Sequence, residues 1–341
     1  MHYRSLGRTG LRVSPMCLGA MMFGAWGNPD HDESISIINR ALDAGINFVD
    51  TADVYAAGES EEIVGKALAG GRRDDVVLAT KAHGAMGRDR NMRGNSRRWL
   101  VREVENSLRR LQTDRIDLYQ IHRPDPSTSH EETLSALTDL QRAGKIIAFG
   151  SSTYPAHEIV EAQWVARTRR LGRFVTEQPP YSMLVRGIER DLLPVAEQYD
   201  MGVLPWSPLA GGWLSGRFRL GQAAPETHRS GRMPARYDLS TDENQLKLQR
   251  ADALAVLAEG AGMTLVDMAV AFVINHPAVT SAIIGPRTME QLESQLGAAD
   301  VDLTTDVLDA IDEIVPPGSN SSPNDGGYDP PSVTDARRRR R

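Results

Sequence analysis

Short apolar runs alternate with longer segments of helical spacing along most of the chain, and this alternation predicts repeated βα units. Such runs suit strands that are buried on both faces of a parallel sheet. We predict eight strands: Pro15–Leu18, Asn47–Asp50, Val76–Thr80, Ile116–Ile121, Ile146–Ser151, Phe174–Glu177, Met201–Trp206 and Val279–Ile284. Helical spacing is present between them in segments such as Asp32–Ala44, Glu59–Leu68, Ser96–Leu111, Glu131–Ala143 and Pro155–Arg167.

The ends of the helical segments carry residues that start and stop helices. Asp32 is a candidate N-cap for a helix that ends at Gly45. Ser96 is a candidate N-cap for the helix that runs to Leu111, and Gly144 ends the helix before the fifth strand. Eight consecutive units predict an α/β protein with a (β/α)8 TIM barrel. An open doubly wound sheet that binds a dinucleotide would need a G-x-G-x-x-G turn, and the sequence contains none.

Two further features shape the predicted barrel. Tyr3–Leu6 and Leu11–Val13 flank a Gly-Arg-Thr-Gly turn, which predicts a β-hairpin at the amino-terminal end. Two connections, Ala82–Asn95 and Ser207 to about Thr241, are longer than turns and follow the third and seventh strands. Long connections are often functional lids, so we expect both to border the mouth, the end of the barrel at which the strands' carboxyl ends meet.

The chain is predicted to form one domain over residues 1–315, followed by a disordered tail over residues 316–341. Pro, Gly, Ser and Asn are abundant from Pro316 to Pro331, and five arginines stand together at Arg337–Arg341. The role of these arginines stays open between a solvated tail and an arm that docks on an anion.

Composition and charge exclude several classes of protein. With 40% hydrophobic and 25% charged residues among 341, the chain has the composition of a folded globular protein. Its net charge is −6, or −11 without the five terminal arginines, which argues against generic nucleic-acid binding. No apolar run approaches the ~18 residues that would span a membrane. The single cysteine, Cys17, permits no intrachain disulfide, and no Cys/His cluster has metal-ligand spacing, so we expect a cytoplasmic protein without a metal.

Polar residues of complementary chemistry stand where the predicted strands end. Asp50 ends the second strand, Lys81 follows the third and His122 follows the fourth. Active sites of such barrels lie at the carboxyl ends of the strands, so these side chains are expected to face a common cavity. Tyr55 lies shortly after Asp50, and an ion pair of Asp50 with Lys81 beside this phenol would stabilise its phenolate.

Three motifs resemble those of the aldo-keto reductase superfamily: NFVDTADVY at Asn47–Tyr55, LATK at Leu78–Lys81 and DLYQIHRPD at Asp117–Asp125. The opening YRSLGRTGLRVSPMCLG is similar to the amino-terminal hairpin and first strand of its bacterial branches, which include relatives of the potassium-channel β subunits. The resemblance covers roughly residues 1–315.

The resemblance implies NADPH-dependent reduction of an aldehyde or ketone, with hydride transfer to the carbonyl carbon. Tyr55 would then be the general acid that supplies the proton. Lys81, held by Asp50, would make that proton easier to lose. His122 would hydrogen-bond the carbonyl oxygen and orient it.

The resemblance also implies contacts to NADP(H). Ser152 matches a serine of the family, whereas Thr153 replaces the usual asparagine and has fewer hydrogen-bonding groups. Gln178 matches a family glutamine, and Trp206 takes the place of the aromatic residue that stacks under the nicotinamide.

A phosphate site is predicted after the eighth strand. Thr288 is a candidate N-cap, and the helix start after it offers free amide groups to an anion. Arg287 adds a guanidinium, which favours the 2′-phosphate of NADP over NAD. The resemblance adds Ser207, Leu209, Gly211, Gly285, Gln291 and Gln295 to the cofactor residues, although the family's Glu-Asn pair is replaced by Ser294 and Gln295.

Apolar and aromatic side chains near the predicted mouth are expected to form the substrate wall. They are Met22, Phe23, Trp26, Trp99 and Tyr181. Arginines in or just after the first long connection are open between binding an anionic substrate and belonging to a solvated loop. They are Arg88, Arg90, Arg93 and Arg97.

Three functions remain open at this point. The first is an oxidoreductase whose partner is a small-molecule carbonyl compound. The second is a regulatory module that binds NADPH and turns over very slowly, like the channel-associated relatives. The third is a barrel enzyme of another class, such as an aldolase that uses Lys81 as a Schiff base. Neither the physiological substrate nor the oligomeric state is encoded in any single residue.

Overall fold

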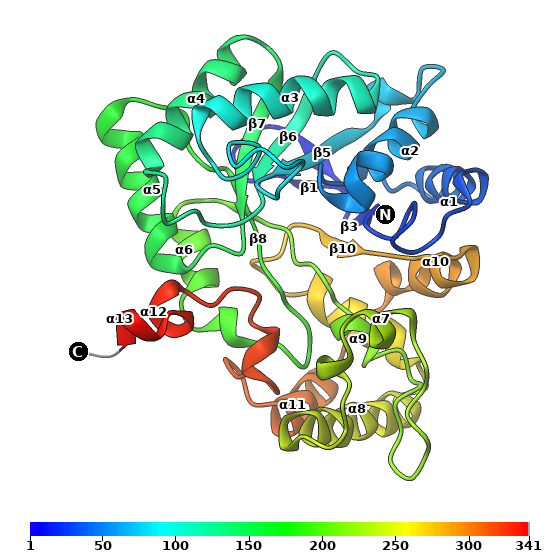
Figure 1. Ribbon diagram of the computed structural model, residues 1–341. Helices are drawn as coiled ribbons and strands as arrows, with labels where there is room; N and C mark the ends of the chain where they lie inside the picture. The colour runs from blue at the N-terminus through cyan, green and yellow to red at the C-terminus, as the bar shows by residue number, and fades with distance from the viewer. Residues whose placement is uncertain (340–341) are drawn as a thin grey trace.

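Eight parallel strands form one curled sheet in the computed structural model, which describes residues 1–339 (Figure 1). The strands lie in the order β10-β3-β4-β5-β6-β7-β8-β9. Isolated parallel bridges join Val203 to Val279 and Trp206 to Ile283, so the chain around β9 also pairs with the chain around β10. The bounds are β3 Met16–Gly19, β4 Phe48–Asp50, β5 Val77–Ala82, β6 Ile116–Ile121, β7 Ile146–Ser152, β8 Thr176–Gln178, β9 Gly202–Val203 and β10 Ala282–Ile284. This α/β arrangement is consistent with a (β/α)8 barrel.

Each predicted strand is present, and most bounds agree to within two residues. The largest difference is in the seventh strand, where regular pairing covers only Gly202–Val203 of the predicted Met201–Trp206. Pro205 has no amide hydrogen to donate, so it pairs only through its carbonyl oxygen, which accepts from Ile283 N at 2.8 Å.

Helices connect the strands and cover the outside of the sheet (Figure 1). The bounds are α1 His31–Asp43, α2 Glu59–Ala67, α3 Arg97–Leu111, α4 His130–Arg142, α5 Ala156–Arg169, α6 Leu192–Gln198, α7 His228–Arg232, α8 Asp242–Gly260, α9 Leu265–Ile274, α10 Met289–Leu296 and α11 Thr305–Ile314. Ser96 caps α3 as predicted. The predicted cap at Asp32 is wrong, because Asp30 has the extended backbone of an N-cap and accepts a hydrogen bond from Glu33 N at 3.0 Å.

The amino-terminal hairpin is present and closes the end of the sheet opposite the mouth. Strands β1 (Arg4–Ser5) and β2 (Arg12–Val13) pair antiparallel. Leu6 and Val13 are fully buried against the side chains that fill the inside of the sheet. Those side chains are Cys17, Phe48, Ala79, Leu118, Ala148, Leu204 and Ile283. The turn fits closely, since a Cβ on Gly7 would lie 2.7 Å from the Val175 carbonyl oxygen and Gly7 has a φ of +53°.

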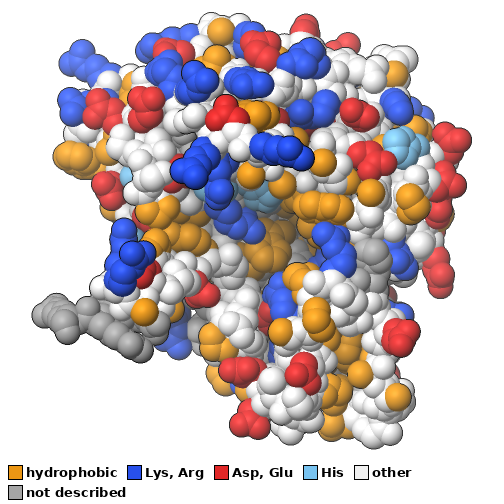
Figure 2. Space-filling model, viewed as in Figure 1, with side chains coloured by type: hydrophobic (Ala, Val, Ile, Leu, Met, Phe, Trp, Pro, Cys, Tyr) orange, Lys and Arg blue, Asp and Glu red, His pale blue; other side chains and the backbone are white. Residues whose placement is uncertain are grey.

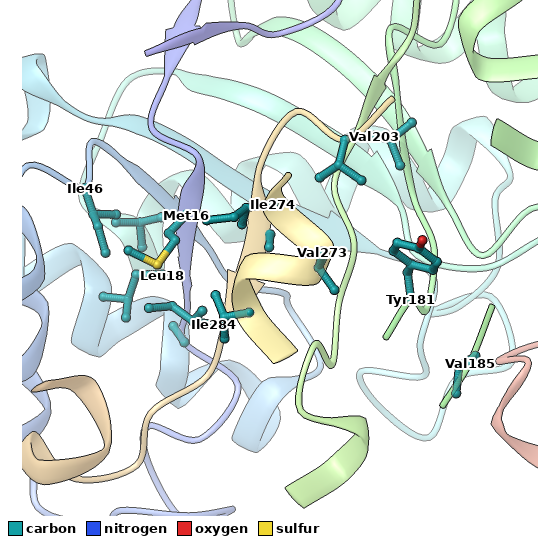
Figure 3. Close-up of a cluster of buried hydrophobic side chains, with 14 of the residues drawn as sticks. Met16, Leu18, Ile46, Tyr181, Val185, Val203, Val273, Ile274 and Ile284 are labelled. Atoms are coloured by element: carbon teal, nitrogen blue, oxygen red, sulfur yellow. The ribbon is translucent and has the colours of Figure 1, made fainter. Parts of the chain in front are cut away.

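A second, larger cluster of buried apolar side chains lies between the sheet and its helices. Figure 3 shows part of it, where Met16, Leu18 and Ile284 of neighbouring strands lie near Val273 and Ile274 of α9. Residues of α9 are buried along most of its length. Among the described residues no single helix is long and apolar enough to cross a membrane. The pair α8 and α9 passes that test only when joined across a 96° bend.

The chain after residue 315 differs from the predicted disordered tail. We call residues 316–327 the C-terminal segment. Its Asp325 is buried and accepts hydrogen bonds from Arg236 Nε at 3.1 Å and from Lys247 Nζ at 3.2 Å. At Gly327 a Cβ would lie only 2.8 Å from Thr153 Cγ2. These contacts hold the segment on the barrel, since a buried charge is retained where it finds a partner.

Two short helices follow the C-terminal segment, α12 (Pro331–Thr334) and α13 (Ala336–Arg339). The last two arginines of the predicted arginine run, Arg340 and Arg341, lie outside the described residues.

Candidate active site

The inside of the sheet changes from apolar to polar toward the mouth. Side chains two apart on a strand share a face, so Asp50 stands above Phe48 and Lys81 stands above Ala79. Pairing of β5 with β6 puts Lys81 opposite Gln120. The alternation of the buried strands therefore produces a polar layer directly above the apolar one.

Lys81 connects the catalytic candidates. Its Nζ donates to Asp50 Oδ1 at 2.5 Å, to the Thr51 carbonyl oxygen at 2.7 Å and to Tyr55 Oη at 3.3 Å. Its side chain is completely buried. Burial lowers the pKa of Lys81, but Asp50 and then Tyr55 outweigh it and the net pKa is raised, so the ammonium keeps its charge.

Two glutamines hold the other oxygen of Asp50. Gln120 Nε2 and Gln178 Nε2 both donate to Asp50 Oδ2 at 3.0 Å. The sequence did not single out Gln120, although a polar residue inside an apolar strand is a signal that could have found it. Asp50 thus has partners on both oxygens, which orients it toward Lys81.

His122 completes the group predicted from the strand ends. Its ring lies edge-on to Tyr55, with ring centroids 5.7 Å apart. Burial, and then the charge of Lys81, lower the pKa of His122 well below its ordinary value. The imidazole is therefore neutral at physiological pH and is able to donate one hydrogen bond.

Backbone in the left-handed region gathers in the loops of the mouth. Ala56 and Ala57, directly after Tyr55, have φ values of 47° and 57°. Thr153, Ser207 and Ala210, in loops after β7 and β9, have φ values of 60°, 64° and 48°. Residues other than glycine avoid this region at a cost of about 1 to 3 kcal/mol each, and such strain is concentrated at functional sites.

The predicted nicotinamide contacts lie together at the ends of β7, β8 and β9. Ser152 Oγ donates to the Gln178 carbonyl oxygen at 2.9 Å. Ser152 Oγ also lies 3.3 Å from Thr153 Oγ1, and both residues are buried. Trp206 is partly exposed, and a Cβ on Gly327 would lie 3.2 Å from its ring. The C-terminal segment therefore borders this part of the mouth.

The predicted phosphate contacts lie at the start of α10. Thr288 caps the helix and accepts from Gln291 N at 3.3 Å, as predicted. Gln291 in turn accepts from Arg287 N at 2.8 Å, rather than from the backbone of the cap residue. Gly285 is exposed with open space around it. Gln295 is buried and donates to the Gln291 carbonyl oxygen at 2.6 Å.

The residues after β9 belong to a long insert over residues 207–241, which we call the insert. Ser207 Oγ accepts from Gly211 N at 3.1 Å, and Leu209 packs partly buried against the core. Tyr237 Oη donates to the Gly211 carbonyl oxygen at 2.8 Å, which ties the two ends of the insert together.

The predicted substrate wall is brought together only in part. The Trp26 ring is partly exposed and lies 6.0 Å from the Tyr55 ring between centroids. Met22 is buried, with 6% of its surface exposed. Phe23 and Trp99 expose 1% or less and offer almost no surface to a ligand. Tyr181 lies in the large apolar cluster (Figure 3) and donates to Glu189 Oε1 at 2.7 Å.

Three arginines that the sequence did not single out reach the mouth. Arg123 Nη1 donates to the His122 carbonyl oxygen at 2.6 Å and to Thr153 Oγ1 at 3.1 Å. Arg232 stacks on the Trp26 ring at 4.7 Å. Arg229 lies beside Gly211 of the insert, where an added Cβ would be 3.8 Å from its Nη1. Burial lowers the pKa of Arg229, and Tyr237 of the same insert opposes this shift. No local signal marks Arg229 and Arg232, because the folding of the insert brings them here.

The four arginines in or just after the first long connection, whose role the sequence left open, are exposed or paired with a carboxylate. Arg88, Arg90 and Arg93 are exposed, and Arg97 pairs with Asp139 at 2.8 Å. Figure 2 shows a hollow on the face viewed in Figure 1, with hydrophobic side chains in it and Lys or Arg side chains along its border. An electropositive border of this kind attracts anionic ligands.

Comparisons with known proteins extend over the whole of this site. The sequence model of the Aldo/keto reductase family matches residues 15–316, which include every strand of the curled sheet. YrpG of Bacillus subtilis (strain 168), described as an uncharacterized oxidoreductase, is 39% identical over 95% of this chain and 98% of its own length. Proteins of Oryza sativa subsp. japonica and Arabidopsis thaliana, described as probable voltage-gated potassium channel subunits beta, are each 36% identical over 92% of this chain and 97% of their own length.

Proposed function

Because the chain belongs to the aldo/keto reductase family, we propose that it reduces an aldehyde or ketone to an alcohol with NADPH. The observation that carries this proposal is the double contact of the Lys81 ammonium with Asp50 and with Tyr55 Oη. It puts a phenolic proton beside a fixed positive charge, next to a neutral imidazole. Proton delivery to a carbonyl oxygen needs these groups in reach of one another.

In this proposal NADPH, when bound, supplies the hydride that reaches the carbonyl carbon. Tyr55 donates its proton to the carbonyl oxygen, and the Lys81 ammonium stabilises the phenolate that is left. Asp50, with partners on both oxygens, keeps the ammonium in place. His122 hydrogen-bonds the carbonyl oxygen and does not compete as the acid, because its lowered pKa keeps it neutral.

The residues present fit a bound NADPH. Ser152, Gln178 and Trp206 would hold the nicotinamide end, and Arg287 with the start of α10 would hold the 2′-phosphate. The Arg287 guanidinium makes neither an ion pair nor a side-chain hydrogen bond with any residue the structure describes, so it is available for a phosphate. We also propose a cytoplasmic location, which the single buried thiol of Cys17 supports.

The rice and Arabidopsis relatives are described as channel subunits, which favours a regulatory role as the second candidate function. In that role the proposed NADPH site would be kept while turnover is very slow. The aldolase alternative is disfavoured, because a Schiff-base lysine must lose its proton and the pKa of Lys81 is raised.

The test is the oxidation of NADPH, followed by the loss of the absorbance of the reduced nicotinamide, with 4-nitrobenzaldehyde and a panel of sugars and keto acids as substrates. We expect multiple turnovers with NADPH and weaker activity with NADH. Tight NADPH binding without turnover would favour the regulatory module instead.

A further inference from the structure

Arg123 is a half-buried arginine beside the proposed catalytic group, with no carboxylate within ion-pair distance among residues 1–339. Only Nη1 is engaged, with the His122 carbonyl oxygen and with Thr153 Oγ1. Its Nε and Nη2 donate no hydrogen bond to the residues that the structure describes. A guanidinium carries five N–H donors, so most of its capacity to bind an anion is unused.

Several other partly buried arginines in the described chain have carboxylate partners. Arg73 pairs with Asp117 at 2.7 Å, and Arg186 pairs with Glu189 at 2.8 Å. A charge that is partly removed from water without a counterion destabilises the fold, so its retention at the mouth calls for a compensating ligand.

Glu177 is the carboxyl group whose charge acts on Arg123, and it compensates the positive charge of Arg123 only in part. Burial lowers the pKa of Arg123, and Tyr55 and Glu177 oppose this through their charge. Glu177 is fully buried, and it accepts from Ser151 Oγ at 2.5 Å and from Tyr154 N at 3.0 Å. Burial raises the pKa of Glu177 to about 7, so near neutral pH only part of the population is ionised.

The position of Arg123 separates it from the proposed phosphate site. It follows β6 and adjoins His122, whereas Arg287 follows β10. In the sheet, β3, β4 and β5 lie between β10 and β6. An anion at Arg123 is therefore better supplied by the molecule that reacts at Tyr55 than by the 2′-phosphate proposed to lie at Arg287.

We propose that Arg123 binds an anionic group, a carboxylate or a phosphate, carried by the carbonyl substrate, and so makes this enzyme selective for acidic aldehydes or ketones. This inference rests on the proposed carbonyl reduction. The contacts of Arg123 with the His122 carbonyl oxygen and with Thr153 hold one edge of its guanidinium. The remaining N–H donors suit an anion that accepts two hydrogen bonds.

The experiment compares substrates that differ mainly in charge. Reduction of 4-carboxybenzaldehyde is measured against its methyl ester, and 4-formylphenyl phosphate separates a phosphate preference from a carboxylate preference. We expect the wild type to favour at least one acid over the ester in kcat/KM. In Arg123→Met this ratio falls by about 10- to 100-fold, the range for losing a charge-assisted pair of hydrogen bonds. Arg123→Lys keeps the charge but loses the planar arrangement of donors, so its acid-to-ester ratio should lie between those of the wild type and Arg123→Met.

The control variant is Arg142→Met, an exposed arginine at the end of α4 that pairs with Asp139 and has no proposed binding role, and it should keep the wild-type ratio. An equal loss for acid and ester in Arg123→Met, or no preference in the wild type, would overturn the inference. A calorimetric titration with benzoate and benzamide needs no turnover. If the wild type binds benzoate and Arg123→Met does not, the anion site is supported even when no aldehyde is reduced. The absence of reduction would then contradict the proposed function and not the anion site.

Discussion

At the scale of single residues, Glu177 makes the stability of the fold depend on pH. It lies fully buried below the mouth, and burial raises its pKa from 4.5 to about 7. The folded protein therefore holds this proton more tightly than the unfolded chain does. Its contribution to stability is fully present below pH 4.5 and is lost as the pH rises through about 7.

We predict that the free energy of unfolding of the wild type falls relative to Glu177→Gln by as much as about 3 kcal/mol between pH 4.5 and pH 8. Urea unfolding of both proteins across this range measures the difference. The comparison cancels other carboxyl groups, such as Asp53, whose pKa is also raised by burial. A difference that does not change with pH would contradict the assignment.

A second prediction for a single residue concerns Arg287 and the choice between NADPH and NADH. Replacing it with Ala should lower the preference for NADPH over NADH by about 10- to 100-fold, because only NADPH carries the phosphate that its guanidinium would bind. Dissociation constants from fluorescence titrations with both cofactors measure the preference. Arg40→Ala is the matched control, since Arg40 is already paired with Glu293 of α10 at 2.7 Å. An unchanged preference in Arg287→Ala would remove Arg287 from the phosphate site.

At the scale of elements, the C-terminal segment is attached to the insert and to α8 through Asp325. The side chain of Lys247 on α8 is only 2% exposed, and Asp325 is its carboxylate partner. Asp325→Asn leaves this ammonium buried without a counterion, so we expect the free energy of unfolding to fall by about 3 kcal/mol. Urea unfolding at constant pH checks the value. Asp329→Asn, at an exposed position two residues beyond the C-terminal segment, should change the free energy of unfolding by less than about 0.5 kcal/mol.

The insert is expected to become more ordered when NADPH binds. Its two ends are joined by the Tyr237 hydrogen bond to Gly211, and the Trp213 and Phe218 rings stack at 4.2 Å. Loops of this kind close over ligands. Hydrogen exchange of residues 207–241 should slow with NADPH present, while the amides of α4 provide the unaffected reference. Equal exchange with and without NADPH would show that the insert does not respond to the cofactor.

For the whole molecule, the strands could be predicted because each buried strand leaves an apolar run in the sequence. Asp50, Lys81 and His122 could be placed at one mouth because parallel strands of one sheet end on the same side. The packed C-terminal segment could not be predicted. Its pairing of Asp325 with Lys247 joins residues 78 positions apart, and no local pattern records such a contact. Arg229 and Arg232 reach the mouth for the same reason.

The central claim concerns the proton of Tyr55, and one variant tests it most directly. Tyr55→Phe keeps the aromatic ring near His122 and Trp26 but removes the hydroxyl group that contacts Lys81. Reduction of a carbonyl substrate by NADPH should fall by about 10²- to 10⁴-fold, the range for losing one positioned acid. The dissociation constant of NADPH, measured on the same protein, should stay within about twofold of the wild-type value, because the residues proposed to hold the cofactor are unchanged. Full activity in Tyr55→Phe would contradict the proposed mechanism, and a loss of NADPH binding would assign Tyr55 a structural role instead.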